Sequence, residues 1–165
     1  MGHEEHHKSA KAQINVFVVT VSDTRTEEND TSGQLIKERL MSSGNAVAGY
    51  KIVPDDPDVL EKLLNELPDS TQAVIINGGT GISKRDNTFD VVQNILDKDL
   101  PGFGELFRYL SYLEIGPAAM MSRATAGLMN GLPVFSVPGS TGAVKLAMDK
   151  LIIPEIAHFF WEANR

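Results

Sequence analysis

Four short segments of this chain carry residue types suited to holding a phosphorylated ligand. They are Ser22-Asp23-Thr24-Arg25, Pro54-Asp55-Asp56, Asn77-Gly78-Gly79-Thr80-Gly81 and Pro138-Gly139-Ser140-Thr141-Gly142. Each follows a short run of apolar and β-branched residues, which is typical of a buried strand. Because the carboxyl ends of parallel strands meet at one edge of a sheet, we expect the four segments to lie together there.

Two of these segments are rich in glycine and could bind an anion through backbone amides. Gly78, Gly79 and Gly81 can adopt positive φ and let a ligand approach the bare backbone. Gly139-Ser140-Thr141 precedes a predicted helix, whose first amides and partial positive charge favour phosphate. The alternatives are a tight strand-to-helix turn for the first segment and ordinary helix capping for the second. The spacing matches neither a Walker A loop nor a dinucleotide-binding fingerprint.

Carboxylates near these turns could hold a divalent cation. Asp55 follows the second predicted strand, and Asp86 lies in the loop after the glycines. Clustered carboxylates at phosphate sites commonly bind Mg²⁺, which also bridges phosphate oxygens. Glu105 is either a functional acid or simply a first-turn acid of a helix. Arg123 could reach a phosphate or pair with an acid.

Several classes of chemistry are excluded or disfavoured by composition. The chain has no cysteine, which excludes disulfides, thiolate metal sites and cysteine nucleophiles. The four segments contain no histidine, which disfavours hydrolysis by a catalytic triad. Transfer at phosphate needs positioning and charge rather than a protein nucleophile, so it fits these residues better. A net charge of −7 argues against nucleic-acid binding, which needs a basic face.

The elements that must position these residues alternate along the chain. We predict strands at 14–21, 50–53, 73–76 and 134–137, with a strand-compatible segment at 124–129. The first predicted helix starts near Thr31 or Ser32 and ends at Gly44. Further helices are predicted at about 58–67, 88–96, 105–113 and 142–153, with a short helical piece at 117–121. Pro154 should kink or restart the last helix. This alternation predicts one three-layer α/β/α domain over residues 13–165, with a mostly parallel central sheet.

No apolar run approaches the roughly 20 residues of a membrane span. Residues 1–12 lack the apolar run of a secretory signal, and we expect them to form a solvated, disordered tail. A cytoplasmic protein without a membrane or nucleic-acid partner is therefore expected.

Taken together and in order, the motifs resemble the MoaB/Mog family of molybdenum cofactor biosynthesis. The residues that carry the resemblance are Val21-Ser22-Asp23-Thr24-Arg25, Val53-Pro54-Asp55-Asp56, Asn77-Gly78-Gly79-Thr80-Gly81 with Arg85-Asp86-Asn87-Thr88, Pro101-Gly102-Phe103-Gly104-Glu105, and Pro138-Gly139-Ser140. The match runs from about Val16 to Ile153. Residues 105–116 and the compact length look more like the MoaB branch.

The resemblance implies an α/β sheet flanked by helices and a homotrimer or homohexamer that binds molybdopterin, a phosphorylated pterin dithiolene. Active relatives adenylylate its terminal phosphate with Mg-ATP and release pyrophosphate. Two family aspartates needed for that step map onto Asp55 and Asp86, which would also hold Mg²⁺. The residues that map onto the nucleotide and pterin-phosphate pocket are Ser22, Asp23, Gly78, Gly79, Thr80 and Gly81. Pro138-Gly139-Ser140 maps onto a second phosphate loop, beside Thr141.

Two other functions stay open beside the adenylyltransferase. The protein could be a non-catalytic molybdopterin binder or carrier of the same pathway, or, like related domains of competence-damage-type proteins, act on an unrelated nucleotide. Residues 103–121 carry many aromatic and Met side chains, which suits either an interface between subunits or a helix covering its own subunit.

Overall fold

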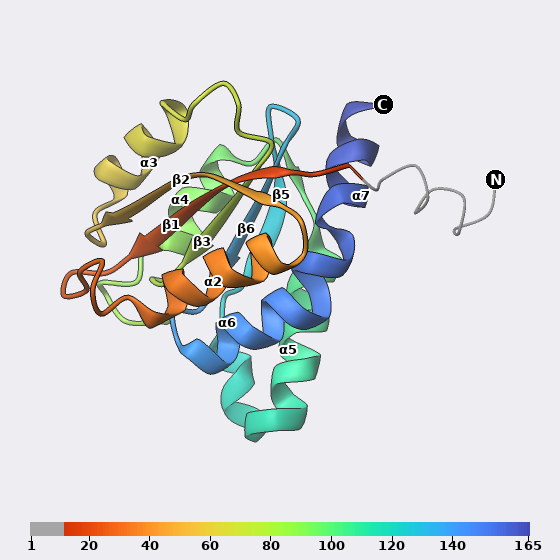
Figure 1. Ribbon diagram of the computed structural model, residues 1–165. Helices are drawn as coiled ribbons and strands as arrows, with labels where there is room; N and C mark the ends of the chain where they lie inside the picture. Colours follow the sequence, from red (N-terminus) through yellow and green to blue (C-terminus); the bar gives the residue numbers. More distant parts are fainter. Residues whose placement is uncertain (1–11) are drawn as a thin grey trace.

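The central sheet has six strands in the order β2-β1-β3-β6-β5-β4 (Figure 1). In this computed structural model, which describes residues 12–165, neighbouring strands among β1, β2, β3 and β6 pair in parallel. β5 pairs antiparallel with β6, and β4 pairs antiparallel with β5. The strand bounds are β1 (Asn15–Val21), β2 (Ala46–Val53), β3 (Ala73–Asn77), β4 (Lys98–Asp99), β5 (Thr125–Met129) and β6 (Leu132–Val137).

Helices cover both faces of this sheet, which confirms the predicted three-layer α/β/α arrangement. One face is covered by α3 (Pro57–Asn65) and α4 (Thr88–Ile95). The other is covered by α2 (Thr31–Ser42), α5 (Pro101–Ile115), α6 (Thr141–Ala147), the π-helical turn η2 (Met148–Ile152) and α7 (Ile153–Asn164). A 3₁₀ helix, η1 (Gly116–Met121), follows α5. The tail expected over residues 1–12 lies, except for Ala12, outside the described residues.

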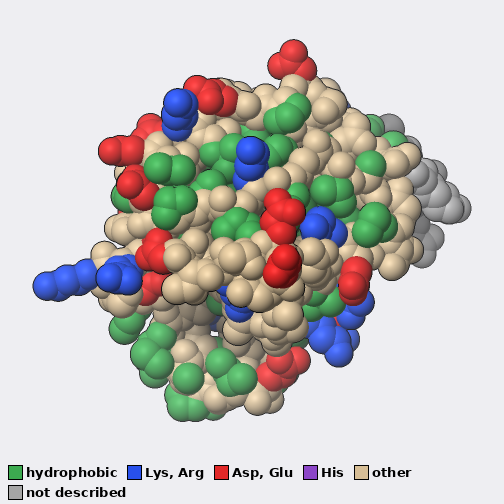
Figure 2. Space-filling model, turned by 60° about the vertical axis from the view of Figure 1, so that its left-hand side comes forward, with side chains coloured by type: hydrophobic (Ala, Val, Ile, Leu, Met, Phe, Trp, Pro, Cys, Tyr) green, Lys and Arg blue, Asp and Glu red, His purple; other side chains and the backbone are tan. Residues whose placement is uncertain are grey.

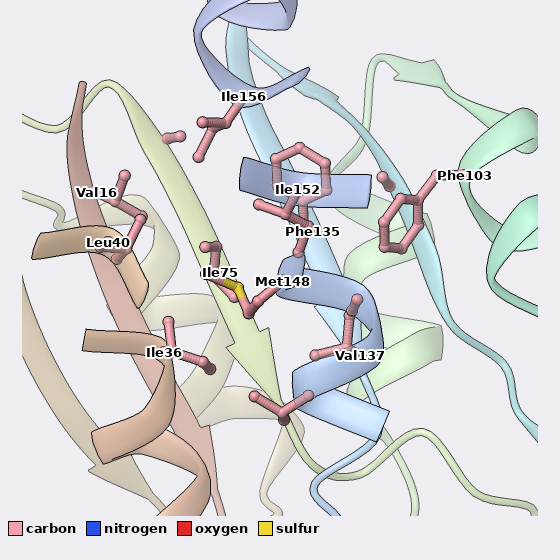
Figure 3. Close-up of a cluster of buried hydrophobic side chains, with 14 of the residues drawn as sticks. Val16, Ile36, Leu40, Ile75, Phe103, Phe135, Val137, Met148, Ile152 and Ile156 are labelled. Carbon is pink, nitrogen blue, oxygen red and sulfur yellow. The ribbon is translucent and has the colours of Figure 1, made fainter. Parts of the chain in front are cut away.

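Alternate residues of the central strands supply the two apolar layers. Val16 and Val18 of β1 face α2, α6 and α7, whereas Phe17 and Val19 face α3 and α4. All four are buried. Figure 3 shows the first layer, in which Ile75 and its neighbours from β1 and β6 meet side chains of the helices. Burial on both faces explains why these strands are continuous apolar runs rather than alternating ones.

Several boundaries differ from the sequence predictions. β2 begins at Ala46 rather than Tyr50, because Gly49 leaves room for the Phe17 ring; a Cβ on Gly49 would lie 2.4 Å from that ring. α2 begins at Thr31, as predicted, and ends at Ser42, two residues before the predicted Gly44. Its capping residue is Asp30, which accepts a hydrogen bond from the Gly33 N–H, rather than Thr31 or Ser32, which are also residue types suited to a cap. The two-residue strand β4 was not predicted, since it is too short to show a period.

The restart at Pro154 is confirmed, because α6 passes through a π-helical turn and α7 begins at Ile153. Within residues 12–165, none of the helices combines the length and the apolar character that crossing a membrane requires.

Candidate functional site

The four predicted loops meet at one edge of the sheet and are joined in pairs by hydrogen bonds that main-chain N–H groups donate. Ser22 donates its N–H to the Val53 carbonyl at 2.9 Å, linking the loops after β1 and β2. Asp55 donates its N–H to the Asp23 carboxylate at 3.0 Å. Gly78 donates its N–H to the Val137 carbonyl at 3.0 Å, which joins the glycine turn after β3 to the end of β6. The Asn87 N–H, which follows the glycine turn, donates to Oδ1 of Asp55 at 3.2 Å and connects the two pairs of loops.

Close backbone contacts explain the glycines of this edge. Gly78 and Gly79 have φ of +100° and +69°, a region that favours glycine. A Cβ on Gly78 would lie 2.2 Å from the Val21 carbonyl oxygen, and one on Gly79 would lie 2.1 Å from the Thr88 hydroxyl oxygen. A Cβ on Gly139 would lie 3.2 Å from the Gly78 Cα, so the two glycine-containing loops are in backbone contact.

The loop 81–87 folds back on itself around Asp86. The main-chain N–H and the hydroxyl of Ser83 both donate to Oδ2 of Asp86, at 2.9 and 2.6 Å. The Ser83 hydroxyl, more than any other group, lowers the pKa of Asp86 below its ordinary value. The Asp86 side chain is therefore an ionised carboxylate at neutral pH.

Asp55 lies against the same loop and has the opposite electrostatic character. The Asn87 N–H donates to Oδ1 of Asp55 at 3.2 Å, so the residue after Asp86 contacts Asp55 directly. Burial raises the pKa of Asp55, and the charges of Asp86 and Asp23 raise it further, against the hydrogen bond from Asn87. Two neighbouring carboxylates with pKa values shifted in opposite directions are typical of functional sites.

The same two carboxylates are chemically suited to Mg²⁺ together with a phosphate. Oδ1 of Asp55 accepts from Asn87, while its Oδ2 faces Gly79, where an added Cβ would lie 3.1 Å away. No group of three or more acidic, His or Cys side chains that could hold a metal occurs within residues 12–165. Mg²⁺ is commonly held by one or two carboxylates plus substrate phosphates, so a pair suffices only when a phosphorylated ligand is present.

The hydroxyl candidates organise the loops that carry them. The Ser22 hydroxyl oxygen accepts from the N–H groups of Thr24 and Arg25, at 3.2 and 3.1 Å. Ser140 caps α6 by accepting from the Ala143 N–H at 3.3 Å. The Thr141 hydroxyl lies 3.4 Å from that of Thr31, so the loop after β6 also touches the start of α2.

Arg123 contacts the loop after β3, whereas Glu105 lies beside the joined loops. The Arg123 guanidinium donates to the carbonyl oxygens of Gly81 and Asp86, at 3.0 and 2.7 Å. α5 begins at Pro101, so Glu105 lies in its second turn and not in the first turn, as one alternative had it. Glu105 lines a pocket of about 420 Å³ beside the loops. Arg123 lines the same pocket, together with Arg108 and Phe89.

A buried polar network that the sequence reasoning missed supports the start of the glycine turn. Asn77 donates to the Thr20 hydroxyl at 2.9 Å, and Thr20 donates to the buried Asp30 carboxylate at 2.6 Å. The Tyr50 hydroxyl also donates to Asp30. Burial is the largest cause that raises the pKa of Tyr50 above its ordinary value, and the hydrogen bond to Asp30 is the second. The sequence signal that could have revealed this network is a polar residue in each of two apolar strands, Thr20 and Asn77.

Comparison with known proteins gives consistent matches along the whole folded chain. A sequence model of a family described as a probable molybdopterin binding domain matches residues 17–158. The chain is 51% identical to molybdenum cofactor biosynthesis protein B of Bacillus subtilis strain 168 over 168 residues, which cover 100% of this chain and 99% of that protein.

Solved structures agree with this match. A crystal structure of a molybdenum cofactor biosynthesis protein B has a TM-score of 0.90 at 49% identity, covering 94% of this chain and 98% of that one. The tungsten cofactor synthesizing protein MoaB from Pyrococcus furiosus has a TM-score of 0.85 at 41% identity, covering 93% and 98%. All four loops described above fall inside the matched residues.

Proposed function

Because the chain belongs to the MoaB/Mog family of molybdenum cofactor biosynthesis proteins, we propose that its joined loops bind molybdopterin and that it adenylylates the terminal phosphate with Mg-ATP. The role in molybdenum cofactor biosynthesis and the molybdopterin-binding domain follow from the family. The observation that carries the finer proposal is the contact between the two glycine-containing loops, with Asp55 and Asp86 on the same edge.

The proposed reaction is a nucleotidyl transfer. An oxygen of the terminal phosphate of molybdopterin attacks the α-phosphorus of ATP, and the bond from that phosphorus to the oxygen bridging to the β-phosphate breaks. Pyrophosphate leaves with the bridging oxygen, and the product carries a new phosphate–phosphate linkage to AMP. Such a reaction depends mainly on positioning and on stabilising charge.

The residues of this edge suit those two requirements. Backbone amides of the glycine turn and of the loop before α6 would bind phosphate oxygens without adding charge. Asp86, with its lowered pKa, stays ionised, and it lies next to Asp55 through Asn87. Two carboxylates would repel a polyphosphate, so they need a cation between them and the ligand. Mg²⁺ held by Asp55 and Asp86 would neutralise phosphate charge when bound.

Replacement of Asp86 by Asn tests the proposal. Wild-type protein mixed with molybdopterin, ATP and Mg²⁺ should release pyrophosphate, and Asp86→Asn should retain molybdopterin binding while kcat falls by at least about 10²-fold, the scale of one lost transition-state contact. Asp149→Asn is the matched control, because Asp149 is exposed and pairs with Arg39 at 2.7 Å outside the joined loops. No pyrophosphate from the wild type, under conditions in which an active relative turns over, would overturn the proposal.

One observation favours a non-catalytic binder as the second candidate. The Asp86 carboxylate is bonded to Ser83 of its own loop through both the main-chain N–H and the hydroxyl. A carboxylate held in this way is less available to a cation. Saturable molybdopterin binding by calorimetry, together with no pyrophosphate release, would assign the protein to this role.

We also propose that the protein assembles with copies of itself through the lobe formed by α5 and η1. Figure 2 shows hydrophobic side chains gathered on the lobe at the bottom of the view. Seven large apolar side chains of these two elements are exposed: Leu106, Tyr109, Tyr112, Leu113, Ile115, Met120 and Met121. Contiguous exposed apolar surface rimmed by polar residues marks interaction sites. A sedimentation run that finds only an 18 kDa species would overturn this proposal.

A further inference from the structure

We propose that Arg123 is a positioning residue, whose guanidinium group fixes both ends of the loop 81–86 and thereby sets where Asp86 lies. The inference rests on the proposed function, because it assigns Arg123 a role through Asp86. Arg123 immediately precedes Ala124 and β5, so it ties this loop to the sheet. The sequence left two roles open for Arg123, a contact to phosphate or a pair with an acid, and the structure shows a pair with Asp90 at 3.3 Å.

The Arg123 side chain donates hydrogen bonds to both ends of the loop. Nε donates to the Gly81 carbonyl oxygen at 3.0 Å, and Nη2 donates to the Asp86 carbonyl oxygen at 2.7 Å. The Arg123 main-chain N–H donates to the Thr80 carbonyl at 3.1 Å. These three bonds hold residues on either side of the turn at a fixed separation. Hydrogen bonds from a charged donor are stronger than neutral ones.

The remaining nitrogen and the flat face of the guanidinium are also occupied. Nη1 lies 3.3 Å from both carboxylate oxygens of Asp90, and the Phe89 ring centroid lies 4.9 Å from Cζ. All three nitrogens therefore bond to protein oxygens. A lysine has one nitrogen on a flexible stem and cannot serve these separate acceptors at once. The geometry requires arginine specifically, whereas a phosphate would accept either cation.

Without the Arg123 side chain the loop keeps its internal bonds and the main-chain bond from residue 123 to Thr80. It loses the two guanidinium bonds that fix the Gly81 and Asp86 carbonyl groups relative to each other. Asp86 donates its N–H to the Ser83 carbonyl at 3.1 Å and accepts from Ser83, so residues 83–86 form a compact turn. On the far side, Asn87 is bonded to Asp55. Loss of Arg123 would let this turn pivot near Asn87. Displacement of a reacting geometry by about 1 Å can cost 10²-fold in rate.

The first test measures amide hydrogen exchange and needs no turnover. Arg123→Gln and Arg123→Lys should both raise the exchange rates of the Ser83 and Asp86 amides at least about tenfold, because local opening becomes easier. Arg39→Gln is the matched control, since its pair with Asp149 is similarly exposed, at 34% against 29% for the Arg123 side chain. Equal exchange in the wild type and both Arg123 variants would overturn the proposal.

Asp90→Asn separates the loop contacts from the surface ion pair. Asp90 is 60% exposed, and exposed pairs contribute little. The variant keeps both carbonyl bonds of Arg123, so the Ser83 and Asp86 amides should exchange at the wild-type rate within about twofold. If these amides exchange as fast in Asp90→Asn as in Arg123→Gln, the ion pair holds the loop rather than the hydrogen bonds to the carbonyl groups. That result would overturn the proposal.

The second test separates positioning from phosphate binding. In the pyrophosphate assay, Arg123→Lys should lower kcat by about 10–10²-fold, with KM for molybdopterin changed less than about threefold. A raised KM with unchanged kcat would identify Arg123 as a phosphate ligand and overturn the proposal. If the wild type releases no pyrophosphate, the proposed function fails, while the exchange comparison still decides whether Arg123 holds the loop. If Arg123→Gln does not fold, Arg123→Lys supplies both readouts.

Discussion

The glycine turn after β3 is packed so closely that a single methyl group added at Gly79 should lower the stability of the fold. Gly79 has φ of +69°, and an added Cβ would lie 2.1 Å from the Thr88 hydroxyl oxygen and 3.1 Å from the Asp55 carboxylate. A Cβ contact below 3 Å requires some part of the structure to move. Gly79→Ala therefore perturbs the backbone and the steric fit at once.

The two contributions can be estimated separately. A non-glycine residue in the left-handed region costs roughly 1–2 kcal/mol. Insertion of a methyl into a packed site typically costs about 1–3 kcal/mol more. Gly79→Ala should therefore lower the free energy of unfolding by about 2–5 kcal/mol. With a urea dependence of about 2 kcal/mol per molar, a loss of 3 kcal/mol would move the midpoint by roughly 1.5 M.

Two further variants separate these costs. Gly44 has φ of +84° and nothing within 4 Å of an added Cβ, so Gly44→Ala should show the backbone cost alone. Thr88→Ala removes the atom that the new methyl would strike; this hydroxyl is buried and, within the described chain, has no hydrogen-bond partner. Thr88→Ala removes the contact at 2.1 Å and leaves those at 3.0 Å to the Cβ of residue 88 and 3.1 Å to Asp55. Because the worst contact is relieved, Gly79→Ala with Thr88→Ala should recover about 1–2 kcal/mol relative to the sum of the single changes.

The assay is urea unfolding followed by circular dichroism, at one protein concentration because self-association would stabilise the folded state. Each variant is also titrated with molybdopterin, and Gly79→Ala should weaken binding while Gly44→Ala should not. If Gly79→Ala costs no more than Gly44→Ala, and Thr88→Ala shows no coupling to it, then the turn relaxes freely. The proposal that the backbone amides of the glycine turn are already in position to bind phosphate would then be wrong.

Three further outcomes follow from the structure. Because the pKa of Asp86 is lowered in the folded state and that of Asp55 is raised, Asp86→Asn should lower the urea midpoint at pH 7 and Asp55→Asn should raise it. The Asp86 difference should vanish below the folded pKa of Asp86, whereas the Asp55 difference should shrink as the pH falls through the folded pKa of Asp55 and vanish only below the ordinary pKa of an unfolded aspartate. Differences that do not change with pH would contradict this. Tyr50→Phe should cost about 1.5–3 kcal/mol in the same assay, because it removes a hydrogen bond to the buried Asp30 carboxylate; an unchanged midpoint would show that the bond contributes nothing. Leu113→Glu places a charge on the exposed face of α5 and should shift sedimentation toward the 18 kDa species, with an unchanged circular dichroism spectrum; an unaffected assembly would place the interface elsewhere.

The strand pattern predicted most of the fold and the edge at which the loops meet. The runs at 14–21, 73–76 and 134–137 correspond to β1, β3 and β6, since strands buried on both faces are unbroken apolar segments. Their parallel order follows from the helices between them. The edge strand β2 was predicted too short, because its first residues are mostly small and include Gly49, a residue type that is uncommon in strands. The role of Gly49, which is to leave room for the Phe17 ring, is visible only in the structure.

The candidate site was predicted less completely than the fold. Gly78 and Gly79 were identified from their residue type and their place directly after a predicted strand, because positive φ is a local requirement. Asp86 was identified from its place after the glycines, but its bonds to Ser83 could not be read from spacing.

The sequence by itself determined which segments end at the carboxyl edge of the sheet and which residue types stand there. Only the tertiary structure decided that Arg123 binds carbonyl groups 42 and 37 positions away, and that Asp30 serves both as a helix cap and as the acceptor of Thr20 and Tyr50. The physical reason is that strands and turns depend on neighbouring residues, whereas these contacts depend on strand order and on the packing that brings distant segments together.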